Sequence, residues 1–155
     1  MDKKVLVPID SITFDNTYRS VEESLEYAST CEIEGGAELI FLHVWNVRTS
    51  DISKSEDGRM QEMRKKEMET EFNEIKKMCK EKGVENFRTV FREGEKAHEE
   101  IVKTAQEENV DLIIMGSGKV RDSSVKGKIG KFVYGSVTEN VIHEAPCSIL
   151  VTKTK

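Results

Sequence analysis

The residues best suited to bind a ligand lie in one glycine-rich segment, GSGKVRDSSVKGKIGKFVYGSVTEN, at positions 116–140. Glycine allows positive φ and lets a backbone approach a phosphate closely, and a helix start offers unpaired amides at a positive dipole end. The segment leads into an apolar helical run, and five of its side chains are basic: Lys119, Arg121, Lys126, Lys128 and Lys131. This pattern is typical of a phosphate-binding loop.

Neither common nucleotide-binding motif fits this segment. A Walker A loop requires GxxxxGK[ST]. Gly130 and Lys131 are followed by Phe132, and Val125 stands where the first glycine of that motif should be. A dinucleotide-binding fingerprint requires GxGxxG after the first strand, but Arg121 occupies its third glycine position and the segment follows the fourth expected strand.

The elements that must position this loop can be expected from apolar patterns. Strands are predicted at Lys4–Ile9, Ala37–Val44, Asn86–Phe91, Asp111–Met115 and Ser148–Thr152, and helices at Asp15–Glu34, Arg59–Lys82, Glu95–Glu108 and Phe132–Glu144. Strands that alternate with helices predict an α/β doubly wound open sandwich. We expect a five-stranded parallel sheet in the order 3-2-1-4-5, with four helices on both faces, in a single domain over 1–155.

Composition narrows the function classes. The formal net charge of −5 argues against a nucleic-acid partner. The sequence has no apolar run long enough for a transmembrane helix and no signal peptide, so no membrane partner is expected. Cys31, Cys79 and Cys147 form no CxxC pair and read as free thiols, which suits a reducing cytoplasm.

Ligands of such sheets bind beyond the carboxyl ends of the strands, where strand order reverses. The glycine segment begins at one of these ends, and Asp10 and His43 stand at two others. Asp10 either contacts a ligand or N-caps the next turn. His43 either approaches a pocket or packs with a hydrogen bond of its own, and Ser136 is either a phosphate ligand or a helix N-cap.

The stretches VLVPID, LIFLHV, REGEKAHEEIVKTAQEENVDLIIMGS and GSVTENVIHEAPCSILV resemble the universal stress protein family, whose domain is adenine nucleotide alpha hydrolase-like. The resemblance covers essentially the whole chain. It implies a five-stranded parallel sheet, a homodimer formed through the last strand (residues 148–152 here), and either an ATP-binding or a non-binding branch. The binding branch carries G-x2-G-x9-G-[ST] after the fourth strand.

The resemblance implies nucleotide contacts in three places. The adenine end would fall on Pro8, Asp10 and Val44, the ribose and phosphates on Met115 and Gly116, and further phosphate contacts on Gly135, Ser136 and Val137. Asp10 would also help to hold Mg²⁺ through the nucleotide. Small residues at a helix start independently suit a polyphosphate.

The chain departs from the family pattern within the loop. Gly116 and Gly135 are nineteen positions apart instead of thirteen, so the loop is six residues longer. Lys119 stands at the second glycine position, and Gly118 comes one position early. Either Gly118 takes that role with a shifted backbone, or glycines within the loop, Gly127 and Gly130, approach the phosphates. The inserted part, roughly 120–126, would cover the nucleotide, occlude the site or contact a partner subunit.

Three functions therefore stay open. The first is an ATP-binding regulatory module in which ATP with Mg²⁺ acts as a switch for an unknown protein partner. The second is a dimeric interaction protein of the non-binding branch, whose longer loop closes the site. The third is a slow ATPase or nucleotidyl-transfer enzyme. Nothing in the sequence positions an attacking water or supplies an arginine finger, so no fast hydrolysis is expected.

Overall fold

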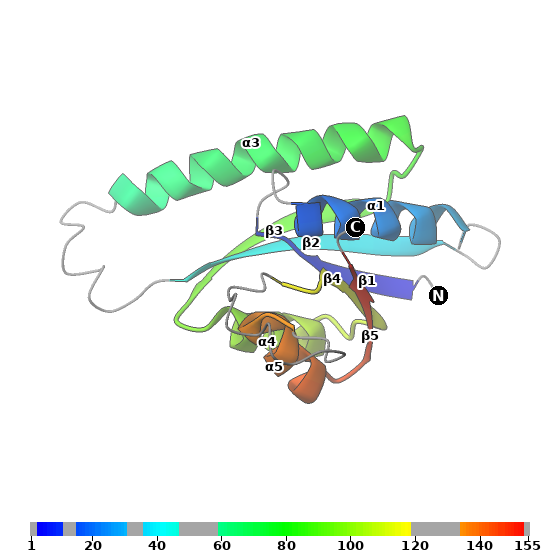
Figure 1. Ribbon diagram of the computed structural model, residues 1–155. Helices are drawn as coiled ribbons and strands as arrows, with labels where there is room; N and C mark the ends of the chain where they lie inside the picture. Colours follow the sequence, from blue (N-terminus) through cyan, green and yellow to red (C-terminus); the bar gives the residue numbers. More distant parts are fainter. Residues whose placement is uncertain (1–2, 11–14, 31–35, 47–58, 119–133, 154–155) are drawn as a thin grey trace, which may run out of the picture.

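The computed structural model describes residues 3–10, 15–30, 36–46, 59–118 and 134–153. These residues form a parallel sheet in the order β3-β2-β1-β4-β5. The strands are β1 (Lys3–Pro8), β2 (Ala37–Asn46), β3 (Phe87–Gly94), β4 (Leu112–Gly116) and β5 (Ser148–Thr152). Helices α1 (Asp15–Thr30) and α3 (Arg59–Glu81) cover one face, and α4 (Ala97–Glu107) and α5 (Ser136–Glu144) cover the other (Figure 1). The predicted fold class and strand order are confirmed.

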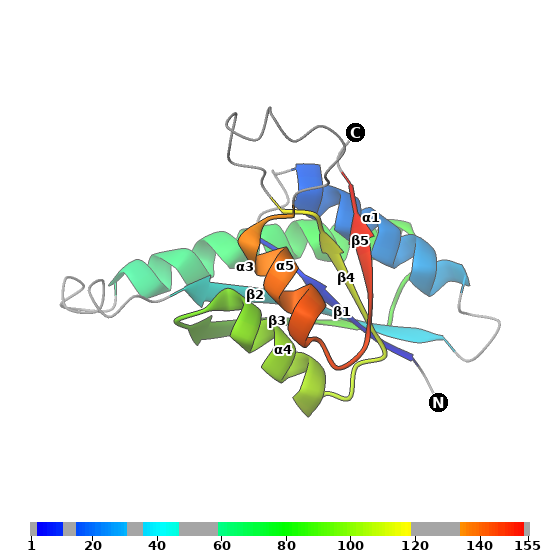
Figure 2. The same ribbon diagram turned by 60° about the horizontal axis from the view of Figure 1, so that its bottom comes forward.

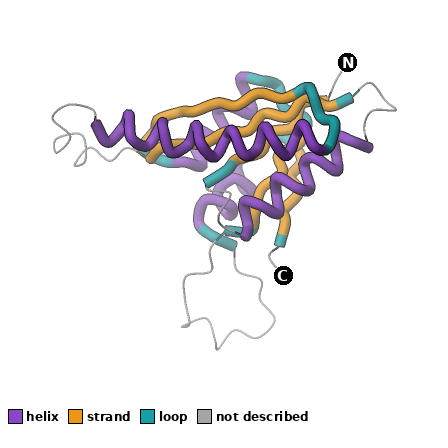
Figure 3. The backbone as a smooth tube through the Cα atoms, turned by 90° about the horizontal axis from the view of Figure 1, so that it is seen from above, coloured by secondary structure: helices purple, strands orange, loops and turns teal. Residues whose placement is uncertain are grey.

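Alternating side chains of the strands build two separate cores. Val5 and Val7 of β1 pack towards α1 and α3, whereas Leu6 between them packs towards α4 and α5. The helices over the first face are seen from above in Figure 3. The apolar stripe predicted on α3 is buried in the first core: Met68, Phe72, Ile75 and Cys79. The central strands therefore read as continuous apolar runs because both of their faces are covered.

Several element ends differ from the prediction. β2 continues past Val44 because it pairs with β3 as far as Asn46. α3 ends at Glu81, and the positive φ of Gly83 (74°) follows it, as expected for a helix C-cap glycine. α5 begins at Ser136, so the prediction is wrong in placing Tyr134 and Gly135 within the helix, whereas the predicted start at Phe132 lies outside the described residues. The backbone at Gly135 is extended, so the helix cannot begin before Ser136.

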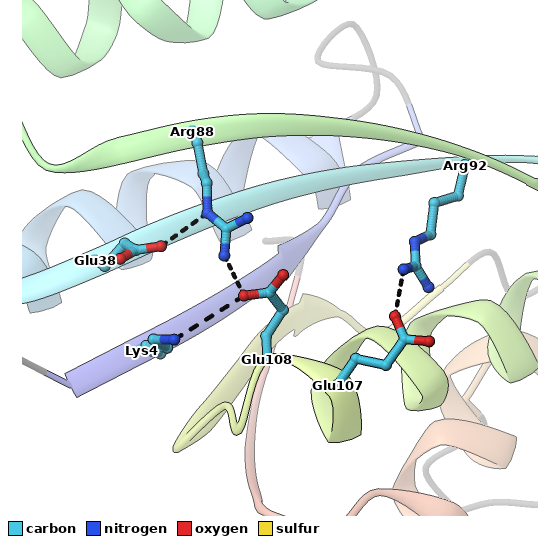
Figure 4. A network of polar contacts seen from close by, with 6 residues as sticks. All are labelled: Lys4, Glu38, Arg88, Arg92, Glu107 and Glu108. Atoms are coloured by element: carbon cyan, nitrogen blue, oxygen red, sulfur yellow. Dashed lines mark hydrogen bonds and ion pairs between the residues drawn. The ribbon is translucent and has the colours of Figure 1, made fainter.

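Ion pairs tie the edge strand β3 to the end of α4 (Figure 4). Arg88 donates to Glu38 over 2.8 Å and also to Glu108, which in turn lies 4.0 Å from Lys4. Its pairing with Arg88 lowers the pKa of Glu108. Further along β3, Arg92 donates to Glu107, the last residue of α4. Charged pairs therefore connect the β3 edge of the sheet to β2 and to the end of α4.

The described cysteines are free and lie in apolar surroundings. Cys79 is buried, and burial raises the pKa of its thiol to about 11. Burial also raises the pKa of the half-buried Cys147. Both thiols therefore stay protonated near neutral pH and make poor nucleophiles. Cys31 lies outside the described residues. Among the described helices, none has the length and apolar character needed to cross a membrane.

Candidate phosphate site at the β4–α5 junction

The carboxyl end of β4 lies beside the start of α5 (Figure 2), and hydrogen bonds connect the two. The hydroxyl of Thr138 donates to the carbonyl of Gly116 over 2.9 Å. The amide of Gly135 donates to the carbonyl of Ser117 over 2.8 Å, and the amide of Ser117 donates to Thr152 of β5 over 3.0 Å. The helix start is therefore fixed to two strands, β4 and β5.

Gly118 completes this junction because only glycine fits there. Its φ is 84°, in the left-handed region that favours glycine. A Cβ at this position would lie 2.8 Å from Cα of Gly135 and 3.2 Å from the hydroxyl of Thr138. Gly118 and Gly135 are therefore in close backbone contact, although residues 119–134 separate them in sequence.

The start of α5 presents backbone amides. Gly135 is the N-cap residue, with φ −63° and ψ 157°, and no side chain caps the helix there. Ser136 is thus the first helical residue, and the alternative in which its hydroxyl N-caps α5 is wrong. The amide of Glu139 donates to the carbonyl of Gly135 over 2.9 Å, which is the first hydrogen bond within the helix. The three preceding amides, those of residues 136–138, have no acceptor within the helix. Ser136 and Val137 are exposed at this positive end of the helix dipole.

A second group of the predicted residues lies at the ends of β1 and β2. The amide of Ile9 donates to Leu42 over 2.8 Å, and the carbonyl of Ile9 lies 2.9 Å from Nδ1 of His43. Asp10 follows with an exposed side chain. Pro8 and Val44 are half-buried on the neighbouring strands. This group and the β4–α5 junction lie on either side of the sheet position where strand order reverses, between β1 and β4.

His43 is a packed side chain rather than one that opens into solvent. It is 2% exposed, and its ring centroid lies 5.6 Å from that of Phe91. Burial lowers its pKa, and the positive charge of Arg64 adds to this. The carbonyl of Ile9 and the carboxylates of Asp10 and Glu71 act in the opposite direction.

The remaining predicted residues are placed as follows. Met115 has a side chain that is 5% exposed and packs in the core beneath α4 and α5, so only its backbone can face a ligand. Gly127, Gly130 and the insertion at 120–126 lie outside the described residues. Sequence reasoning missed Thr138 and Ser117. The signal for Thr138 was its place in the first helical turn after Gly135, from where a hydroxyl can reach back to the preceding loop.

Metal binding by protein side chains alone finds no support in the part of the chain that the structure describes. No group of three or more His, Cys, Asp or Glu side chains there is arranged to hold an ion. Asp10 therefore has no such group around it, and a magnesium ion would need phosphate oxygens as its main ligands.

Comparison with known proteins gives a consistent result. The universal stress protein family matches residues 1–153. The universal stress protein of Methanothermobacter thermautotrophicus is 37% identical over 161 residues, which span 99% of this chain and 97% of that protein. Universal stress protein MJ0577 of Methanocaldococcus jannaschii is 32% identical over 170 residues, covering 100% of this chain and 97% of that one. Its solved structure superposes with a TM-score of 0.74 over 100% of this chain and 98% of that chain.

Two more distant structures contain adenine nucleotides. One is a universal stress protein in complex with cAMP, at 17% identity and a TM-score of 0.68, covering 99% of this chain and 98% of that chain. The other is the universal stress protein from Archaeoglobus fulgidus in complex with dAMP, at 16% identity and a TM-score of 0.61, covering 96% of each chain. At these identities the likeness shows the fold alone. The family match and the closer relatives show more: this chain belongs to the universal stress protein family.

Proposed function

We propose that this protein is an adenine-nucleotide-binding regulatory module whose ligand is ATP with Mg²⁺. The phosphates would lie against the amides of Ser136 and Val137 and the backbone at Gly116 and Gly118. The base would lie towards Asp10 and the ends of β1 and β2. The adenine nucleotides bound by two proteins of this fold support this choice of ligand.

The observation that carries the proposal is the contact between Gly118 and Gly135. A Cβ on Gly118 would lie 2.8 Å from Cα of Gly135, so the residues on either side of the long loop meet at the start of α5, where the phosphates would lie under this proposal. The six additional residues therefore do not separate Gly116 from the start of α5. Gly118, with its positive φ, suits the role of the second family glycine, because a residue with a side chain would be strained in that conformation.

The residues present fit the group that they would hold. Exposed amides at a helix start, without a side-chain cap, bind phosphate oxygens through hydrogen bonds and the helix dipole. Magnesium would neutralise phosphate charge when it arrives with the nucleotide. The described residues would bind and orient the ligand, and the bound state would be read by a protein partner through a changed surface.

Charge at the helix start tests the proposal. Ser136→Asp places a carboxylate where phosphate should bind, whereas Asn73→Asp adds the same charge on the exposed face of α3. Calorimetric titration with ATP and Mg²⁺, after removal of any nucleotide that copurifies, should give micromolar affinity for the original chain, about −8 kcal/mol. Ser136→Asp should weaken binding by at least about tenfold and Asn73→Asp should leave it unchanged. Equal affinities for all three proteins would reject this site.

A second candidate function rests on the surface of β5 and α5. Leu150 is 41% exposed on the edge strand, and Ile142 on the adjacent helix is 38% exposed. An edge strand with exposed apolar side chains favours pairing with a second copy. We propose that β5 forms a homodimer, and that dimerisation alone is the function if the nucleotide titration shows no binding.

A further inference from the structure

The side chain of His43 is hydrogen-bonded to the residue that follows β1, Ile9. The carbonyl of Ile9 accepts a hydrogen bond from Nδ1 of His43 over 2.9 Å, while the amide of Ile9 donates to Leu42 over 2.8 Å. Both backbone polar groups of Ile9 are therefore bound to β2. The side chain of Ile9 is also buried, at 4% exposure. Asp10 is the next residue, and its position is set by this double attachment.

The same imidazole reaches a third strand. His43 is paired with Phe91 in the register of β2 and β3, and the two rings lie 5.6 Å apart with an interplanar angle of 38°. Val44, the next residue of β2, packs towards the opposite face of the sheet. One buried side chain thus connects β2, which carries Val44, to the residue that precedes Asp10, just beyond the end of β1.

The protonation pattern of His43 follows from its contacts. A carbonyl oxygen can only accept a hydrogen bond, so Nδ1 of His43 carries the ring proton and donates it in the hydrogen bond to Ile9. Nε2 is then an acceptor, and among the described residues no hydrogen-bond partner reaches it. Core packing alone does not explain a buried ring nitrogen left in this state, because an apolar side chain would fill the space without that penalty. The hydrogen bond from Nδ1 to Ile9 is what an imidazole provides at this position and an apolar side chain cannot.

We infer that His43 is a positioning residue of the nucleotide site: its ring holds the Ile9 carbonyl, and through it Asp10, at the spacing from Val44 that the base of the ligand requires. This inference rests on the proposed function. It assigns His43 to the base end of the ligand and gives it no role at the phosphate end. Loss of the hydrogen bond between His43 and Ile9 should therefore change recognition of the base, and it should not affect binding of the phosphate groups.

Two variants of similar size separate the hydrogen bond from packing. In His43→Asn the amide nitrogen occupies nearly the place of Nδ1 and can still donate to Ile9, whereas His43→Leu has the same shape without a donor. The probes are Mg²⁺-ATP, Mg²⁺-GTP and inorganic tripolyphosphate, titrated into each protein. His43→Leu should bind ATP about tenfold more weakly than His43→Asn and lose preference for ATP over GTP. Both variants should bind tripolyphosphate equally.

Hydrogen exchange of the Ile9 amide gives a readout that needs no ligand. Exchange should accelerate in His43→Leu and stay close to that of the original chain in His43→Asn. Equal exchange and equal ATP affinity in the two variants would overturn the inference. Failure of the original chain to bind any of the three probes would instead overturn the proposed function, and the exchange result would then decide whether His43 holds Ile9 at all.

The nitrogen chemical shifts of the imidazole provide a test without substitution, should the leucine variant fail to fold. The original chain should show a protonated Nδ1 and an unprotonated Nε2 at pH 7. A proton on Nε2 with a bare Nδ1 would exclude the bond to Ile9 and refute the positioning role.

Discussion

The hydroxyl of Thr138 donates a hydrogen bond to the carbonyl of Gly116 over 2.9 Å and joins residues 22 positions apart in sequence. This bond, together with the one from Gly135 to Ser117, holds the end of β4 against the start of α5. The proposed phosphate site is therefore built by backbone and short side chains at a junction of two elements. Its stability should depend on groups that contact no ligand themselves.

Replacing Thr138 by Val should remove the bond to Gly116 while preserving the shape of the buried side chain. We expect the free energy of unfolding to fall by about 1–2 kcal/mol, together with a loss of ATP affinity as Gly116 moves. The control is Thr104→Val, another buried threonine, whose hydroxyl donates to Glu100 within its own helix, α4. Urea unfolding and nucleotide titration should show an effect on affinity only for Thr138→Val. A similar loss of affinity in both variants would mean that the junction has no special role.

Gly118→Ala should destabilise the protein more than Gly83→Ala. Both glycines have positive φ, 84° and 74°, so both substitutions incur about 1 kcal/mol or more of backbone strain. A Cβ at Gly83 meets nothing within 4 Å, whereas a Cβ at Gly118 meets the backbone of Gly135. We expect a total of about 2–3 kcal/mol for Gly118→Ala. Denaturation midpoints that fall equally in the two variants would contradict the close contact between the loop ends.

The strands of this fold could be predicted well from sequence, since buried parallel strands are short apolar runs. The apolar run SILVT predicts a strand over Ser148–Thr152, and the structure has the same bounds. The start of α5 was missed because the apolar pattern continues through Phe132, while the actual start depends on the bond from Gly135 to Ser117. Local pattern carries no information about such a distant partner.

The candidate site could be predicted only in part. The glycines and the carboxyl ends of the strands could be identified, because residue type and topology suffice for that. Two alternatives for Ser136 and His43 could not be resolved, since each depends on which neighbour the folded chain provides. The structure makes Gly135 the N-cap of α5 and gives His43 the carbonyl of Ile9 as its partner.

Leu150→Lys should dissociate the proposed homodimer. A lysine at this exposed position of β5 places charge in the apolar contact, and the folded monomer should remain stable because Leu150 is 41% exposed. Met63→Lys is the control, because Met63 is 61% exposed on α3, away from β5. Sedimentation equilibrium should show a lower association constant for Leu150→Lys alone. An unchanged association constant in Leu150→Lys would place the interface elsewhere.

The buried His43 should make the protein less stable in mild acid. Its pKa is lowered in the folded state, so the unfolded chain binds more protons between the ordinary histidine pKa, about 6.5, and the folded value. Its neutral form therefore stabilises the fold above about pH 6.5, and this contribution is lost as the pH falls through that window. The slope from this group is at most about 1.4 kcal/mol per pH unit.

His43→Asn removes this titration and should flatten the fall in unfolding free energy between pH 7 and pH 5. The exposed His143→Asn serves as the control for loss of a histidine at the surface. Urea unfolding at several pH values measures the slopes. An identical slope in the original chain and in His43→Asn would show that His43 is not the group responsible.

The most direct test of the nucleotide site is a map of backbone amide shifts during titration of the ¹⁵N-labelled protein with Mg²⁺-ATP. The signals of Gly118, Ser136 and Val137 should move, together with those of Ile9 and Asp10, while signals along α3 such as that of Asn73 should stay in place. No movement at millimolar ATP, or movement confined to residues away from the β4–α5 junction, would contradict the proposed nucleotide site.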